Sequence, residues 1–282
     1  MKFRTILFAL ISIVASSCTE KIDIPLDNSY SRLVVDGSIT TDTMAHKVVL
    51  TSTSSYYFNQ PPPPVTGALV SVSDGTNTFN LSEKTPGVYC TESNVYGIPG
   101  KTYSLNIKLA EAIGGFTDYN ASSVIYPVAA MDSINLLFHP EWSKNGIWEV
   151  KCYVQEPPTV DFYRFLLYKD QVLLTDTLDE WLITDDTFFN GNYTNGLPIA
   201  YIDQSNNDQK LKPGDTITAE VNSLGKEYFN FLTEAQTELF GSNPLFGGPP
   251  ANIQGNINNG AVGFFSAYSA TRSYAITPEF KK

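Results

Sequence analysis

Apolar and polar residues alternate one by one along much of this chain, and this period of two limits the fold more than any other feature. The clearest run is Thr102–Leu109, in which Tyr103, Leu105, Ile107 and Leu109 share one face and polar residues occupy the other. Alternation of this kind predicts a β-strand with one buried face and one solvated face.

Six further runs in the first half alternate similarly and are separated by turn dipeptides such as Asp74-Gly75 and Pro99-Gly100. These runs are Leu33–Ile39, His46–Thr53, Gly67–Ser73, Thr76–Leu81, Gly87–Thr91 and Phe116–Tyr126. So many short strands with regular turns predict an N-terminal β-sandwich over residues 31–127.

The second half, residues 128–282, is predicted to be a second β-rich domain, since a chain of 282 residues suits two domains. Its strand-like runs are Trp148–Gln155, Phe162–Tyr168, Val172–Leu174 and Asp215–Val221, with a hairpin at Lys169–Gln171. Apolar residues then recur at helical spacing from Leu224 to Leu239. This predicts one amphipathic helix near 223–240, capped by Asn222 or Ser223 and packed on the second sheet. The expected fold class is mainly β.

The first 18 residues have the pattern of a lipoprotein leader. Lys2 and Arg4 precede the apolar run Ile6–Ala15, which is too short to span a bilayer, and small residues then lead to Cys18. Small residues directly before a cysteine resemble a bacterial lipobox. We therefore expect a signal peptide at 1–17, lipid on Cys18, and a polar tether at 18–30. The acidic residues of that tether resemble a surface-export signal, although an ordinary solvated linker has the same composition.

Several short motifs occur in an order that resembles a known family. They include Leu33–Thr40, Gly67–Val72, Gly87–Tyr89, Gly100–Leu105, Met131–Ile134, Asn243–Phe246 and Asn256–Tyr268. Together they resemble the Bacteroidota lipoprotein family catalogued as domain of unknown function 4249. The resemblance implies an immunoglobulin-like or carboxypeptidase-regulatory-like first domain. It also implies a SusC-like TonB-dependent outer-membrane transporter as partner, with companion lipoproteins. It implies no catalytic residues.

Catalytic motifs are absent from the sequence. It contains no Gly-x-Ser-x-Gly elbow, phosphate-binding loop or dinucleotide fingerprint, and its only histidines are His46 and His139. Both histidines are expected in loops or at the surface. A net charge of −11 argues against nucleic-acid binding. We therefore expect a protein without catalytic activity and without a cofactor.

Acidic residues and cysteines leave some alternatives open. The carboxylate pairs Asp179-Glu180 and Asp185-Asp186 are expected to face water, although paired acids can hydrolyse glycosides. The oxygen-rich segments Asp185–Asn195 and 203–208 could hold calcium, but neither has the spacing of an EF-hand loop. Cys90 and Cys152 are expected as two buried free thiols, with a disulfide between them as the alternative.

Exposed aromatic side chains are the best candidates for contacts with a ligand or partner. Tyr56, Tyr57 and Phe58 run directly into Pro61–Pro64, a segment expected to be extended and outside any sheet. Phe246 lies in a second glycine- and proline-rich loop, and Trp142 and Trp181 are further candidates. Stacking on sugars and docking of peptides would use the same side chains.

These observations predict a lipid-anchored protein of the outer membrane that faces the cell exterior. We expect it to be an accessory subunit that captures oligopeptide or glycan for the transporter. Two alternatives remain: an adhesin or surface-structural subunit, and a surface hydrolase.

Overall fold

The computed structural model describes residues 31–54, 60–207, 209–241 and 253–280, and it is mainly β, as predicted. The seven strands expected in the first half all form. They are β1 (Leu33–Thr40), β2 (Lys47–Ser52), β3 (Leu69–Ser73), β4 (Thr78–Thr85), β5 (Val88–Cys90), β6 (Thr102–Ile113) and β7 (Phe116–Val124). Their inward-facing residues, such as Val35, Tyr103 and Leu105, enclose a first hydrophobic core.

The second half contains strands that the sequence predicts and others that it does not. The predicted ones are β9 (Ile147–Tyr153), β10 (Phe162–Lys169), β11 (Val172–Leu173) and β14 (Thr216–Leu224). The additional ones are β8 (Ser133–His139), β12 (Leu182–Asp185), β13 (Leu197–Asp203) and β15 (Val262–Ile276). A 3-10 helix, η1 (Leu178–Glu180), and the helix α2 (Lys226–Gly241) complete the described elements.

Hydrogen bonds join the described strands into two sheets. The large sheet has the order β11-β10-β14-β15-β1-β2-β5-β4-β3-β6-β7, with β12 also paired to β10. The small sheet has the order β13-β9-β8. A second hydrophobic core contains side chains from both sheets, among them Trp148 and Val150 of β9 and Phe165 and Val221 of the large sheet.

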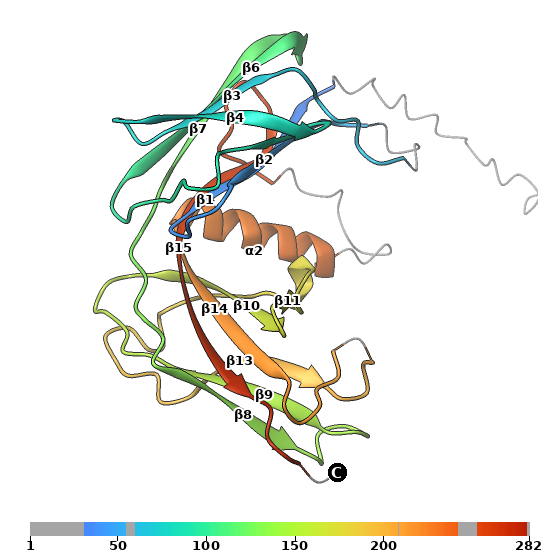
Figure 1. Ribbon diagram of the computed structural model, residues 1–282, viewed down its shortest axis with the longest axis vertical. Helices are drawn as coiled ribbons and strands as arrows, with labels where there is room; N and C mark the ends of the chain where they lie inside the picture. Colours follow the sequence, from blue (N-terminus) through green and yellow to red (C-terminus); the bar gives the residue numbers. More distant parts are fainter. Residues whose placement is uncertain (1–30, 55–59, 208, 242–252, 281–282) are drawn as a thin grey trace, which may run out of the picture. The chain divides into compact units, whose positions relative to one another are not determined.

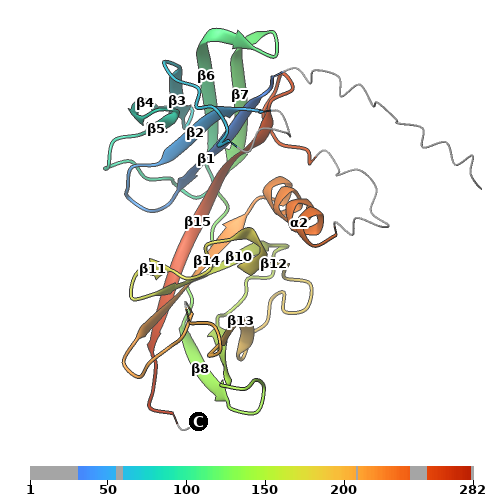
Figure 2. The ribbon, with the colours of Figure 1, turned by 90° about the vertical axis from the view of Figure 1, so that its right-hand side faces the viewer.

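The strand β15 belongs to both parts of the fold (Figures 1 and 2). Its first residues pair in parallel with β1, with Gly263 opposite Val35, and its later residues pair antiparallel with β14. Phe265 is fully buried in the first core although it lies near the C-terminus. The first core therefore contains residues from both sides of the boundary expected at residue 127. Residues 31–282 form one compact unit.

The predicted helix is present as α2, three residues later than its expected start. Residues 222–224 instead extend β14, where Asn222 pairs with Arg164 of β10, so neither Asn222 nor Ser223 caps the helix. Phe229 packs on Phe162, with ring centroids 4.7 Å apart, and Tyr228 packs on Phe264 at 4.9 Å. The apolar stripe thus covers the large sheet. Among the described residues, no helix has both the length and the hydrophobicity needed to cross a bilayer.

The family motif near the C-terminus covers the edge strand β7. The backbone N–H of Asn258 donates to the carbonyl oxygen of Asn120 (3.1 Å), and its side-chain Oδ1 accepts from the Asn120 N–H (2.8 Å). The side chain of Asn259 donates to the carbonyl oxygen of Asp118 (2.8 Å). These bonds satisfy backbone groups that an open sheet edge would leave unpaired.

The end of the proline run Pro61–Pro64 lies along strand β2. The carbonyl oxygen of Pro63 accepts the N–H of Ser52 (2.9 Å), and Pro64 forms an isolated bridge with Thr51. Proline can accept hydrogen bonds at a sheet edge although it cannot donate them. The prediction that this segment lies outside any sheet is therefore wrong in part.

We predict that Gly263→Ala lowers the free energy of unfolding by about 3 kcal/mol or more. Gly263 has φ +96°, and a methyl group there would overlap the backbone carbonyl oxygen of Val35 across the β1–β15 pairing. The matched control is Gly75→Ala. Gly75 has φ +84°, but a methyl group there would meet no atom within 4 Å, so we expect a loss of only about 1–2 kcal/mol. Chemical denaturation measures both, and equal losses would contradict this role of Gly263.

Candidate functional site

The small sheet has one buried face and one face that carries aromatic and charged side chains. Strands β8 and β9 alternate: Leu136 and Val150 point into the second core, whereas Leu137 and Glu149 pair on the opposite side. Tyr201 of β13 pairs with Glu149 from the other flank. We call this group the aromatic face. It comprises Leu137, His139, Trp142, Glu149, Lys151 and Tyr201.

Hydrogen bonds to the end of β13 hold the loop that carries Trp142, which connects β8 to β9. The hydroxyl of Ser143 donates to Oδ1 of Asp203 (3.0 Å), and the N–H of Gln204 donates to the carbonyl oxygen of Gly146 (3.0 Å). The position of Trp142 is therefore determined by the small sheet itself.

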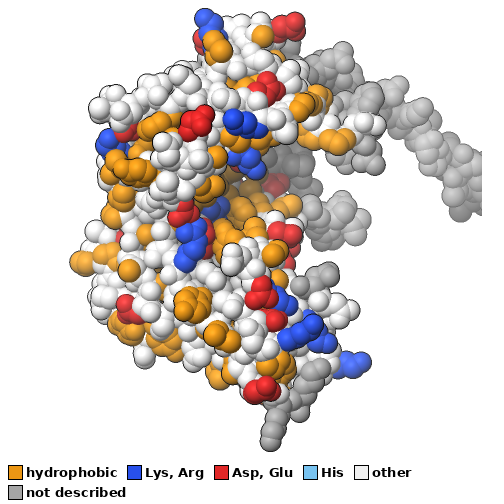
Figure 3. Space-filling view, in the orientation of Figure 1, with side chains coloured by type: hydrophobic (Ala, Val, Ile, Leu, Met, Phe, Trp, Pro, Cys, Tyr) orange, Lys and Arg blue, Asp and Glu red, His pale blue; other side chains and the backbone are white. Residues whose placement is uncertain are grey.

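The rings of the aromatic face are ordered against one another. Trp142 stacks on His139 with ring centroids 3.6 Å apart and an interplanar angle of 3°. Tyr201 lies 5.9 Å from Trp142 at 51°. Trp142 and Tyr201 are nevertheless 47% and 56% exposed, and Leu137 is 43% exposed. In Figure 3, hydrophobic side chains lie at the surface, mixed with charged ones, in the part of the view where Figure 1 places β8 and β9.

Glu149 lies on the central strand of this face and is only 5% exposed. Its Oε2 is 3.0 Å from Nε2 of His139 and 3.4 Å from Nζ of Lys151. Its Oε1 has no hydrogen-bond partner among the described residues. This oxygen is not among the buried side-chain atoms without a partner, so solvent reaches it. A ligand that offers a hydroxyl or an N–H group could therefore take the place of water at this atom.

The residues predicted to contact a ligand fall in three places. Trp142 is on the aromatic face. Trp181 is half-buried, donates its indole N–H to the carbonyl oxygen of Thr175 (3.1 Å) and lies under the guanidinium of Arg164 at 4.7 Å. Trp181 and Tyr201 line the same groove, and Tyr201 also contacts Trp142. The remaining predicted residues lie outside the described residues: Cys18, Tyr56, Tyr57, Phe58 and Phe246.

Sequence reasoning identified only Trp142 as a contact residue and missed the other five members of the aromatic face: Leu137, His139, Glu149, Lys151 and Tyr201. His139 was expected in a loop or at the surface, and it ends β8 close to the surface. The alternation of β9 places Glu149 on the outward side, but its neighbours come from strands that pair with β9 from far away in the sequence. The other histidine, His46, does lie in a loop but is buried at 3% exposure. Its Nδ1 accepts the N–H of Thr40, and burial lowers its pKa.

Three carboxylates outside the aromatic face form a second cluster of polar side chains. Oxygen atoms of Glu156, Asp161 and Asp186 lie within 4.8 Å of one another. The expectation that Asp186 faces water is wrong, since it is 2% exposed and accepts the N–H of Asp161 (3.1 Å). These three are the described residues best placed to hold a cation, and Asp186 belongs to one of the two oxygen-rich segments that could bind calcium. Calcium stays an untested alternative to the expected absence of a cofactor.

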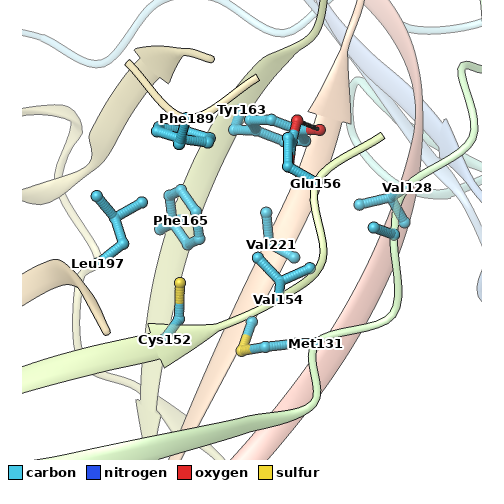
Figure 4. Close-up of a pocket in the computed structure, with 11 residues that line it drawn as sticks. Val128, Met131, Cys152, Val154, Glu156, Tyr163, Phe165, Phe189, Leu197 and Val221 are labelled. Carbon is cyan, nitrogen blue, oxygen red and sulfur yellow. Dashed lines mark hydrogen bonds between the residues drawn. The ribbon is translucent and has the colours of Figure 1, made fainter. Parts of the chain in front are cut away.

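Glu156 also lines a small apolar cavity of about 20 Å³ in the second core (Figure 4). The hydroxyl of Tyr163 donates to Oε1 of Glu156 (2.6 Å). Burial, together with the charges of Asp161 and Asp186, raises the pKa of Glu156 to about 7. Near neutral pH this carboxyl group therefore holds a proton much of the time, which lowers the negative charge available to a cation.

The two cysteines are free thiols in the structure, so the alternative of a Cys90–Cys152 disulfide is wrong. Cys152 is completely buried in the second core, and burial raises the pKa of its thiol to about 12. Cys90 is half-buried at the end of β5, which corrects the expectation that both are buried.

The fold and the aromatic face define a mainly β protein with a candidate binding surface on its small sheet. Residues 19–273 match the family described as a domain of unknown function (DUF4249), and the chain belongs to this family. The match confirms the resemblance to the DUF4249 family. A comparison with curated proteins finds no match to the chain.

We predict that Glu156→Gln removes a pH dependence of stability. The pKa of Glu156 is raised from 4.5 to about 7 in the folded state, so the folded protein binds more protons than the unfolded chain between these values. Its contribution to stability is therefore complete below pH 4.5 and is lost as the pH rises to about 7. At about 1.4 kcal/mol per pKa unit, the loss is at most about 3 kcal/mol.

Glutamine keeps an oxygen that can accept the Tyr163 hydroxyl but carries no proton that titrates in this range. Relative to the unsubstituted protein, the variant should gain stability between pH 5 and pH 8. Thermal unfolding at both pH values measures the gain, and the exposed Glu92 is the control, as Glu92→Gln. A difference that is independent of pH would contradict the assignment.

Proposed function

We propose that this protein is a lipid-anchored, non-catalytic protein of the outer-membrane surface that binds nutrient for a SusC-like TonB-dependent transporter. The bound nutrient is an oligopeptide or a glycan. The observation that carries this proposal is the aromatic face, on which the exposed rings of Trp142 and Tyr201 share one side of the sheet with Glu149, whose Oε1 is open to solvent.

The rigidity of the face supports a binding role. Ring stacking, the Ser143–Asp203 hydrogen bond and the small sheet hold the side chains in place before a ligand arrives. Preorganised groups lose little conformational entropy on binding. Exposed aromatic side chains with two rotatable angles are typical of contact surfaces for the same reason.

The proposed location is supported by the leader. Lys2, Arg4 and the apolar run to Ala15 precede Cys18, and the polar residues that follow can tether the folded part to a bilayer. Acyl chains contribute about 0.8 kcal/mol per buried methylene, so lipid on Cys18 would retain the protein at the membrane. The transporter partnership rests on the setting that the resemblance in the sequence implies.

We predict that Cys18→Ala releases the protein from the membrane fraction, because no acylated residue then remains. Fractionation of a Bacteroidota host that expresses the full chain measures the distribution. Intact-mass analysis of the unsubstituted protein should show acyl groups on Cys18. The matched control is Cys90→Ala, which removes a half-buried thiol of the folded part and should leave the protein in the membrane. Retention of the Cys18→Ala protein in the membrane would contradict the anchor.

We further predict that the tagged full chain co-purifies with an outer-membrane TonB-dependent transporter from solubilised membranes. Mass spectrometry identifies the recovered proteins, and the Cys18→Ala variant is the control for association that depends on the membrane. Failure to recover a transporter would contradict the partnership. Polymers of the protein in size-exclusion chromatography would favour the structural alternative, and turnover of glycan or peptide substrates would favour the hydrolase alternative.

A further inference from the structure

We propose that the ligand of the aromatic face is a neutral carbohydrate. A pyranose ring stacks on the free side of Trp142, and one of its hydroxyl groups donates to Oε1 of Glu149. This inference rests on the proposed function and names the ligand class of the same site.

Trp142 provides a flat platform with only one side available. His139 covers one face of the indole at 3.6 Å and nearly parallel, while the residue as a whole remains 47% exposed. The free face is therefore the part of the ring that solvent reaches. A pyranose presents a patch of C–H groups of similar size, and contact between the two yields dispersion and weak C–H···π attraction. Tyr201, tilted at 51°, forms a wall beside this platform.

The polar groups of the face suit hydroxyl groups, which both donate and accept. Oε1 of Glu149 is an acceptor that solvent reaches and that has no partner among the described residues, although the side chain as a whole is only 7% exposed. The ammonium of Lys151 is a donor 3.4 Å from the other carboxylate oxygen, and its side chain is 28% exposed. Asn135 pairs with Lys151 on the neighbouring strand and is exposed, so it adds an amide that can donate and accept.

An extended peptide is a poorer fit to this face. Peptides that bind to sheets take much of their affinity from main-chain hydrogen bonds to a free strand edge. Glu149 and Lys151 lie on β9, whose backbone is paired on both sides, with β8 and with β13. The aromatic face therefore offers a ligand only side-chain groups and ring surface. A peptide could instead pair with the outer edge of β13, beside the face rather than on it.

The charges around the site favour a neutral ligand over an anionic one. The charge of Lys151 is offset by Glu149, and a second carboxylate, that of Glu141, lies 3.7 Å from Nδ1 of His139. The whole chain carries a net charge of −11. Uronate-rich or sulfated glycans would therefore meet repulsion both at the face and from the protein as a whole.

Isothermal titration calorimetry on the full, lipidated chain tests this inference. The protein is held in a detergent without a sugar headgroup, and the titrants are neutral hexaoses of glucose, mannose, xylose and galactose in α and β linkages. Oligogalacturonate is the anionic comparison, and a set of hexapeptides is the peptide comparison. We expect at least one neutral hexaose to bind and oligogalacturonate to bind at least tenfold more weakly.

Variants place the binding on the aromatic face. Trp142→Ala and Glu149→Gln should each lower the affinity for that hexaose at least tenfold. Tyr201→Ala changes a side chain that is 56% exposed, so it tests the same face if either of the other two fails to fold. The matched control is Tyr274→Ala, an exposed tyrosine on β15 outside the face, which should change the affinity by less than twofold.

The outcomes separate this inference from the proposed function. Absence of binding by every hexaose overturns the carbohydrate assignment. Peptide binding that Trp142→Ala abolishes also overturns it but leaves nutrient binding at this face intact. Peptide binding that no face variant changes overturns the face as the site, while the proposed function still stands. If no sugar or peptide binds and no transporter co-purifies, the proposed function fails as well.

Discussion

The strand β15 is the element on which the rest of this structure depends. It pairs in parallel with β1 in the first part of the fold and antiparallel with β14 in the second, so one continuous backbone contributes to both cores. The pairing of β15 with β1 brings the backbones of Gly263 and Val35 close together, and a side chain at position 263 would collide with Val35. The loop before β15 also covers the edge of β7, because the side chains of Asn258 and Asn259 form hydrogen bonds with its backbone. The glycines and asparagines of the family motif therefore have structural roles.

A buried polar network continues this arrangement across the second part of the large sheet. Arg164 of β10 is 4% exposed and donates from Nε and Nη2 to the side-chain oxygen of Asn222 on β14. Asn222 in turn donates to Glu220, and Glu220 accepts from Arg272 of β15 (2.7 Å). A charge removed from water is tolerated when its hydrogen bonds are satisfied and aromatic rings lie over it. Trp181, at 4.7 Å from Arg164, is thus part of the framework beside the candidate site.

The small sheet shows how one set of strands can serve both stability and binding. Its inner side chains, such as Trp148 and Val150, complete the second core. The burial of these side chains holds the small sheet against the large sheet. The outward side chains are consequently held in a fixed array, and the loop of Trp142 is bonded to the end of β13. A face of this kind can bind a ligand without a large change of backbone, because its geometry is maintained by the core behind it.

Local patterns in the chain were enough to predict most of the individual elements. Alternation predicted the strands of the first half, helical spacing predicted α2, and the hairpin at Asp170 and Gln171 appears with positive φ at both residues. Trp142 was also identified as a candidate contact from the sequence. Long-range packing was needed to show that β15 joins both cores, that Asp186 is buried beside Glu156, and that His139 and Tyr201 flank Glu149. The alternation of β15 is obscured because Phe264 and Phe265 are both buried, one beneath α2 and one in the first core. The other features depend on pairing between residues far apart in the chain, and no local periodicity carries that information.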